Sequence, residues 1–233
     1  MPMDKEKFAR EALDRLAAKY GRNLHTELSH KNITELFVAV LLSPQCTDKQ
    51  INNVTPELFD RFRTFSQYAD ADARTLMRYL KGANYYKTKA RNLKKAAGII
   101  VDRFDGKVPK TLEELMELPG VGRKVANVVL NEGFGINEGI AIDTHCITVA
   151  GRLKLSKHRN PEKIERDIMR LLPKDEWGRI SNLMIALGRD TCTAREKECR
   201  RCCLSEICPS SDAKKNTEKI GNKQDWFSEL SGA

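Results

Sequence analysis

Apolar residues recur every three or four positions along almost the whole chain, and this spacing restricts the protein to a helical fold. Phe8, Leu13, Leu16 and Tyr20 fall on one face of a first predicted helix, because one face of an α-helix returns every 3.6 residues. No stretch shows the alternation of apolar and polar residues that is typical of a half-buried strand. We therefore predict an all-α protein with about ten helices. The later segments with this spacing are residues 51–62, 73–81, 88–104, 111–117, 122–133, 144–152, 161–172 and 176–188.

Proline and potential capping residues indicate where several of these helices begin and end. Thr34 is expected to cap a second helix, which should stop at Ser43-Pro44, because the residue before proline disfavours helical backbone. A break is expected at Thr55-Pro56, and Asn160-Pro161 reads as a helix start. After about residue 212 the chain becomes polar and loses its periodicity, so we expect residues 213–233 to form a loosely attached tail.

The charge and the cysteine content restrict the environment and the partner. The 233 residues carry a net charge of +9, which indicates either a well-solvated surface or a polyanionic partner that clustered Lys and Arg would bind. We expect no signal peptide and no membrane span, and therefore a cytoplasmic, nucleoid-associated protein. In that reducing compartment the seven cysteines favour metal ligation over disulfides.

Residues 112–131, LEELMELPGVGRKVANVVLN, predict two helices joined by a tight glycine turn. Gly120 and Gly122 leave the backbone uncovered, so that amide groups at the start of the second helix can bind a phosphate. The alternative is an ordinary αα-hairpin with no ligand.

Lys124 lies in the first turn of that second helix, and Asp143 follows an apolar run 19 positions later. The positive end of the helix dipole disfavours a protonated lysine and favours the neutral amine, which forms Schiff bases with sugar carbons. The alternative for Lys124 is a phosphate contact. Asp143 is expected to cap a helix starting near Thr144, a role that is compatible with catalysis because a capping carboxylate is rigidly held.

Four cysteines lie within residues 192–208, CTAREKECRRCCLSEIC, in the pattern C-x6-C-x2-C-x5-C. The density predicts metal ligation, while the spacing by itself leaves zinc and iron–sulfur open. For Cys46, Cys146 and Cys203 we favour packing. The four predicted ligands are Cys192, Cys199, Cys202 and Cys208.

The string LPGVGRK resembles the helix–hairpin–helix of the DNA glycosylase superfamily, and specifically that of the endonuclease III family. The string IDTH, which contains Asp143, and the four-cysteine loop are similar to motifs of the same family. The resemblance spans roughly residues 5–209. It implies Lys124 as nucleophile, Asp143 as the essential carboxylate and a [4Fe–4S] cluster on the four cysteines. One departure is Leu187-Gly188-Arg189, where the family has a histidine in place of leucine.

The same resemblance implies two helical domains with the active site in the cleft between them. A six-helix barrel domain with the hairpin at 112–131 is expected over 27–136, and an iron–sulfur cluster domain over 1–26 and 137–212. It also implies direct contacts with DNA. Gln45, in LSPQCTD, would face the orphaned base and Tyr85 would act as a wedge, although both segments are also consistent with polar turns. The remaining DNA contacts expected are Gly120, Val121, Gly122, Arg123, Arg195 and Lys197.

These expectations define a bifunctional DNA N-glycosylase/AP lyase of base excision repair. It would act as a monomer on double-stranded DNA with damaged pyrimidines or abasic sites. Alternatives are a thymine or uracil mismatch glycosylase of the same fold, against which Lys124 argues, and a non-catalytic DNA-binding iron–sulfur protein.

Overall fold

A computed structural model describes residues 4–213, and the regular structure within that range is helical throughout, apart from one isolated bridge between Cys192 and Lys197. The all-α prediction is therefore confirmed. The described chain forms two compact units. We call residues 25–141 the hairpin unit, and the described residues before and after it the cysteine unit. In residues 4–213 no helix combines the length and apolar character needed to cross a bilayer.

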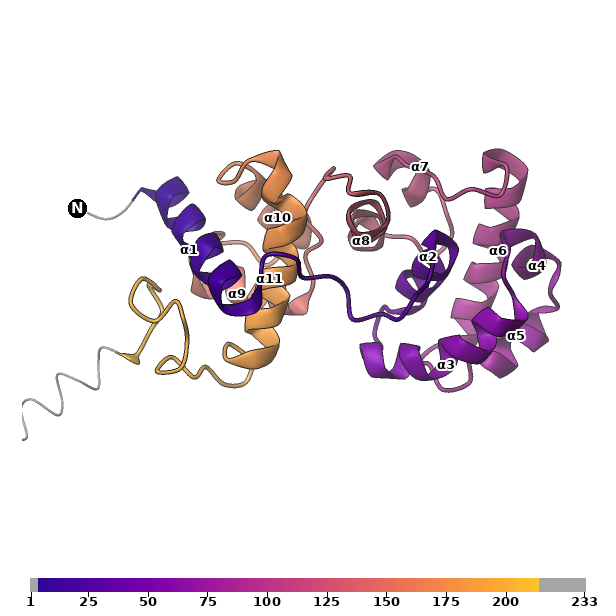
Figure 1. Ribbon diagram of the computed structural model, residues 1–233, viewed down its shortest axis with the longest axis horizontal. Helices are drawn as coiled ribbons and strands as arrows, with labels where there is room; N and C mark the ends of the chain where they lie inside the picture. The colour runs from indigo at the N-terminus through magenta and orange to yellow at the C-terminus, as the bar shows by residue number, and fades with distance from the viewer. Residues whose placement is uncertain (1–3, 214–233) are drawn as a thin grey trace, which may run out of the picture. The chain divides into compact units, whose positions relative to one another are not determined.

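The hairpin unit is built around a helix that is apolar on every side. From Leu36 to Leu42 each residue of α2 is buried, as expected for a helix without a polar face. It packs against α3, α6 and α8, while α4 and α5 lie beside the long helix α6 (Figure 1). The helices are α2 (Ile33–Leu42), α3 (Asp48–Arg61), α4 (Phe65–Asp70), α5 (Ala73–Tyr79), α6 (Tyr86–Phe104), α7 (Leu112–Met116) and α8 (Arg123–Phe134).

The cysteine unit joins the first helix to the last ones. Its elements are α1 (Lys5–Tyr20), α9 (Thr144–Arg152), α10 (Pro161–Met169), the 3₁₀ turn η1 (Lys174–Glu176) and α11 (Trp177–Asp190). The helix α11 packs against both α1 and α9. A Cβ on Gly188 would come within 2.7 Å of the Cβ of His145, so a glycine lets α11 approach α9 closely and His145 acts as a packing residue. Residues 191–212 follow without a helix, contain turns and the isolated bridge, and hold the four-cysteine loop.

Two local expectations are wrong. The second helix is capped by Asn32 and not by Thr34, because the Asn32 side chain accepts a hydrogen bond from the Glu35 amide at 2.9 Å. The break at Thr55-Pro56 is absent, since α3 runs through Pro56. The Thr55 hydroxyl bonds to the carbonyl of Ile51 at 3.0 Å, and burial of this face holds the helix together across the proline.

The short helix α4 is not anticipated, and with it the hairpin unit holds seven described helices where six are expected. Its start carries a capping box, in which Thr64 accepts from the Gln67 amide and Gln67 accepts from the Thr64 amide. Thr-x-x-Gln before an apolar residue is a recognisable helix start, so this sequence signal was available. The predicted domain limits, 27 and 136, fall near the limits of the compact unit at 25 and 141. The predicted tail begins at the last described residue, and the rest of it lies outside the described residues.

Candidate functional site

The turn between α7 and α8 accepts only glycine at its centre. Gly120 has a φ of +88°, which is unfavourable for other residues, and a Cβ there would lie 2.8 Å from Nδ2 of Asn92 and 3.2 Å from Cδ1 of Leu41. Gly122, by contrast, has open space around it. Val121 is buried and its amide donates to the Leu118 carbonyl at 3.0 Å. The turn therefore presents bare backbone on its outer side while its apolar side is anchored in the core.

The N-terminus of α8 differs from those of α7 and α9, the helices before and after it in the sequence. Within the described residues no side chain accepts a hydrogen bond from its first-turn amides. The helix α7 is capped by Thr111 and α9 by Asp143. At α8, where Gly122 is the N-cap, the first-turn amides face outward with the positive end of the helix dipole. Lys124 is the second residue of this helix and is half-buried, beside a half-buried Arg123. Such an end binds anions, and a lysine there adds a nucleophile.

Asp143 lies in the cysteine unit, at the start of α9, and caps that helix as expected. Its Oδ1 accepts a hydrogen bond from the Cys146 amide at 2.8 Å, and the Cys146 side chain is fully buried. The carboxylate of Asp143 is half-buried and is held in one orientation by the helix that it caps. This geometry supplies a fixed negative charge.

Gln45 and Tyr85, the two residues expected to enter DNA, share an unusual backbone. Both lie in the left-handed region, with φ values of 59° and 56°, a conformation that costs about 1–3 kcal/mol for a non-glycine residue and clusters at functional sites. Their side chains are exposed, that of Tyr85 by 67%. The structure brings the two loops together, because Nδ2 of Asn84 donates to the carbonyl of Gln45 at 2.6 Å. Asn84 was not singled out by the sequence, since this contact joins residues 39 positions apart.

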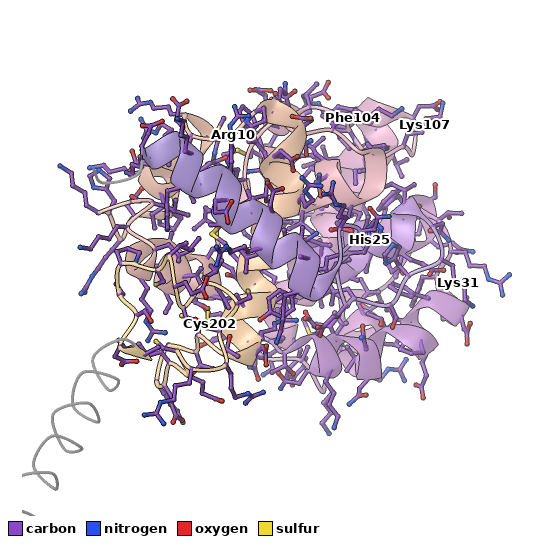
Figure 2. All side chains as sticks on the ribbon, turned by 60° about the vertical axis from the view of Figure 1, so that its left-hand side comes forward. Arg10, His25, Lys31, Phe104, Lys107 and Cys202 are labelled. Carbon is purple, nitrogen blue, oxygen red and sulfur yellow. The ribbon has the colours of Figure 1, made fainter. Side chains whose placement is uncertain are left out.

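The four predicted ligand cysteines line one cavity. Cys203 is not among the residues that line it, although its neighbour Cys202 is; Figure 2 marks Cys202 within the irregular segment after α11. A hydrogen bond from the Cys203 thiol lowers the pKa of Cys202 to about 6, against the opposing effect of burial. The geometry therefore separates the four predicted ligands from the surplus cysteine beside them.

Arg152 is a residue of this region that the sequence analysis missed. From the last turn of α9 its guanidinium donates to Sγ of Cys192 at 3.2 Å and to the carbonyl of Thr193 at 2.7 Å. It thereby ties the start of the cysteine loop to a helix 40 positions earlier. An arginine in a helix carries no local signal of such a contact.

The two basic residues expected to reach DNA from the cysteine loop differ in their surroundings. Nζ of Lys197 lies 3.1 Å from a carboxylate oxygen of Asp212 and donates to the Ser210 carbonyl at 2.8 Å. Arg195 is exposed and makes no hydrogen bond or ion pair within residues 4–213. Arg195 is thus available for a phosphate, whereas Lys197 is held against the loop.

Comparison with known proteins defines the class. Residues 38–174 match the model of the HhH-GPD superfamily base excision DNA repair proteins. Endonuclease III of Synechocystis sp. is 42% identical over 80% of this chain and 85% of its own, and that of Escherichia coli is 36% identical over 78% and 86%. A solved structure of a trapped endonuclease III–DNA covalent intermediate matches with a TM-score of 0.84 and 38% identity, over 89% of this chain and 97% of the other.

The fold and the hairpin thus place the chain among the helix–hairpin–helix proteins of base excision repair. Within that class the chain belongs to the endonuclease III family. It is a DNA glycosylase with AP lyase activity.

Proposed function

We propose that this enzyme removes oxidised or otherwise damaged pyrimidines from double-stranded DNA, with Lys124 as the nucleophile, and then cuts the strand at the resulting site. The observation that carries the proposal is the position of Lys124, in the first turn of an uncapped helix directly behind a glycine turn. The amine of Lys124 thus lies at an anion-binding helix end, where a DNA phosphate would be held, and a lysine amine forms Schiff bases with electrophilic carbon.

The chemistry proceeds in two stages. The Lys124 amine attacks C1′ of the flipped nucleotide, the glycosidic bond breaks, and the base leaves with its electron pair and takes up a proton. Asp143 is the proposed carboxylate that serves as the base and stabilises the positive charge that develops on the sugar. The C1′–O4′ bond then breaks, O4′ takes up a proton, and the nitrogen and C1′ form the Schiff base. The Schiff base acidifies C2′–H, and loss of that proton expels the 3′ phosphate by β-elimination. Water afterwards releases the lysine.

Gln45 and Tyr85 are proposed to fill the space that the flipped nucleotide leaves. Extrusion costs a few kcal/mol of stacking, which an exposed aromatic ring and an exposed amide can partly recover. The left-handed backbone at both residues supports this role, because strain of this kind persists where function requires a particular presentation. Backbone amides of residues 120–123 would hold a phosphate of the same strand.

We propose that Cys192, Cys199, Cys202 and Cys208 hold a [4Fe–4S] cluster. The four thiols surround one cavity, and a [4Fe–4S] cluster is held by four cysteine thiolates. The similarity of the four-cysteine loop to that of the endonuclease III family favours the cluster over zinc. When bound, the cluster would cross-link residues 191–208, which have little regular structure of their own. We further propose that the protein acts as a monomer on chromosomal DNA in the nucleoid.

Reduction of the Schiff base tests the proposed nucleophile. With borohydride present, wild-type protein should form a covalent complex with duplex DNA that contains an oxidised pyrimidine. Lys124→Ala should form at least about 10³-fold less, as expected for loss of a nucleophile. The matched control is Lys107→Ala, at an exposed position of the same unit (Figure 2), which should trap like wild type. Equal trapping by Lys124→Ala would overturn the proposal.

Asp143 serves both the fold and the chemistry, and two substitutions separate these roles. Asp143→Asn keeps an N-capping side chain and removes the charge, so stability should change by less than about 0.5 kcal/mol, while single-turnover base release should slow about 10²-fold or more. Asp143→Ala should lose about 1 kcal/mol in addition. Thermal unfolding and single-turnover rates are the measurements, and an Asp143→Asn enzyme with wild-type rates would exclude a catalytic charge.

A further inference from the structure

A buried lysine faces a cysteine at the base of the two loops that carry Gln45 and Tyr85. Nζ of Lys89 lies 2.8 Å from Sγ of Cys46. The lysine is only 7% exposed, although lysine is almost never buried without a partner. In residues 4–213 no carboxylate forms an ion pair with Lys89, so the sulfur of Cys46 is the group that faces its charge.

The environment of Cys46 combines two properties of a reactive thiol. The ammonium of Lys89 stabilises negative charge on the sulfur, and the thiolate is the form that oxidants attack. Cys46 is half-buried and therefore within reach of a small oxidant, unlike Cys146, which is wholly buried. The Asn84 amide donates a second hydrogen bond to the same sulfur at 3.2 Å.

We propose that Cys46 is a peroxide-sensitive modification site, at which oxidation to the sulfenic acid lowers the affinity of the enzyme for damaged DNA. The proposal rests on the proposed function, because it assumes that the adjacent Gln45 and Tyr85 enter the duplex. The chemical class of the modifying agent is a small hydroperoxide.

The reaction balances with the two side chains and one molecule of hydrogen peroxide. An electron pair of the Cys46 thiolate attacks one peroxide oxygen, an S–O bond forms and the O–O bond breaks. The departing hydroxide takes a proton from the Lys89 ammonium and leaves as water. Sulfur is oxidised by two electrons and the peroxide is reduced by two, which gives sulfenic acid beside a neutral amine.

The surroundings of the sulfur explain why one added oxygen would disturb DNA binding. Asn84 connects the two loops through its amide to Cys46 and through its side chain to the carbonyl of Gln45. Gln45, which precedes Cys46, and Tyr85, which follows Asn84, already have strained backbones. An oxygen on Cys46 needs room at a sulfur that already contacts the Asn84 amide and the Lys89 amine, and we expect the resulting shift to reach both loops.

The test treats the intact protein, with its metal cluster monitored by absorbance, with a graded amount of hydrogen peroxide. Sulfenic acid is captured with dimedone and located by mass spectrometry, and affinity for duplex DNA with a reduced abasic analogue is measured before and after. The proteins are wild type, Cys46→Ala and Lys89→Met, which keeps the apolar stem but removes the charge. Each is compared with its own untreated sample, and Cys146 is the internal reference for an unreactive thiol.

We expect dimedone on Cys46 of wild type, about tenfold slower labelling in Lys89→Met, and about a tenfold loss of affinity in oxidised wild type that is absent in Cys46→Ala. An unlabelled Cys46, equal rates with and without Lys89, or an equal loss of affinity in Cys46→Ala would each overturn the proposal. Failure of the proposed function can be told apart from failure of this inference. If only the proposed function fails, untreated wild type forms no trapped complex with oxidised-pyrimidine DNA, while dimedone still labels Cys46.

Discussion

The two units are stabilised in different ways. The hairpin unit encloses a continuous apolar core that runs from Leu28 to Leu130, and its loops are short connections between packed helices. The last segment without helices in the cysteine unit is residues 191–212, which contain turns and one isolated bridge. The helices of the cysteine unit also bury apolar side chains, such as Leu16, Val149 and Leu187, but in this last segment a cavity lined by four cysteines replaces such packing.

This difference indicates how each unit can present functional groups. Helix packing holds strained residues such as Gln45 and Tyr85 in the hairpin unit without any cofactor. The loop of the cysteine unit contains turns and few buried apolar side chains, of which Leu204 is one. Its order should therefore depend on what the thiols bind, since metal binding to such loops contributes directly to folding free energy.

The largest expected effect tests that dependence. If the proposed cluster is present, Cys199→Ala should abolish its visible absorbance and lower the melting temperature of the cysteine unit by about 10 °C or more, which corresponds to ~2 kcal/mol. Hydrogen exchange measured separately for each unit should show that the backbone amides of the hairpin unit stay protected. Cys203→Ala is the matched control, because Cys203 does not line the cavity. If the two variants lost absorbance and stability equally, the assignment of ligands would be wrong.

A smaller effect is expected in the hairpin unit, from Gly120→Ala. The added methyl group meets Asn92 and Leu41 and requires a left-handed backbone, so the free energy of unfolding should fall by about 2–3 kcal/mol and DNA binding should weaken. Gly106 also has a positive φ, +70°, but a Cβ there would lie in open space. Gly106→Ala should therefore lower the free energy of unfolding by only about 1 kcal/mol. Chemical denaturation measures both. Equal losses would show that close packing of the turn contributes nothing.

The smallest effect concerns the charged loop. Arg195→Ala should lower DNA affinity a few-fold and reduce the salt dependence of binding by about one counterion. Lys197→Ala should change that slope less, because Asp212 already pairs with Lys197. Binding measured over a series of salt concentrations decides between them, and a larger change for Lys197 would reverse the ranking.

Short-range patterns account for what the sequence predicted correctly. The helices, the cap at Asp143, the end of α2 before Pro44 and the glycine turn each depend on a few neighbouring residues, and α4 was missed although its capping box is equally local. The contacts of Arg152, Asn84 and Lys89 could not be predicted, because each joins residues about 40 positions apart. Such pairs are decided by tertiary packing, which periodicity does not encode.

The central claim is that one amine, at the start of α8, attacks the sugar. The most direct test is to digest the borohydride-reduced protein–DNA complex and to locate the deoxyribose remnant by mass spectrometry. We predict the remnant on Lys124, in the peptide that follows the glycine turn. A remnant on another lysine or on the N-terminal amine, with Lys124 unmodified, would contradict the account.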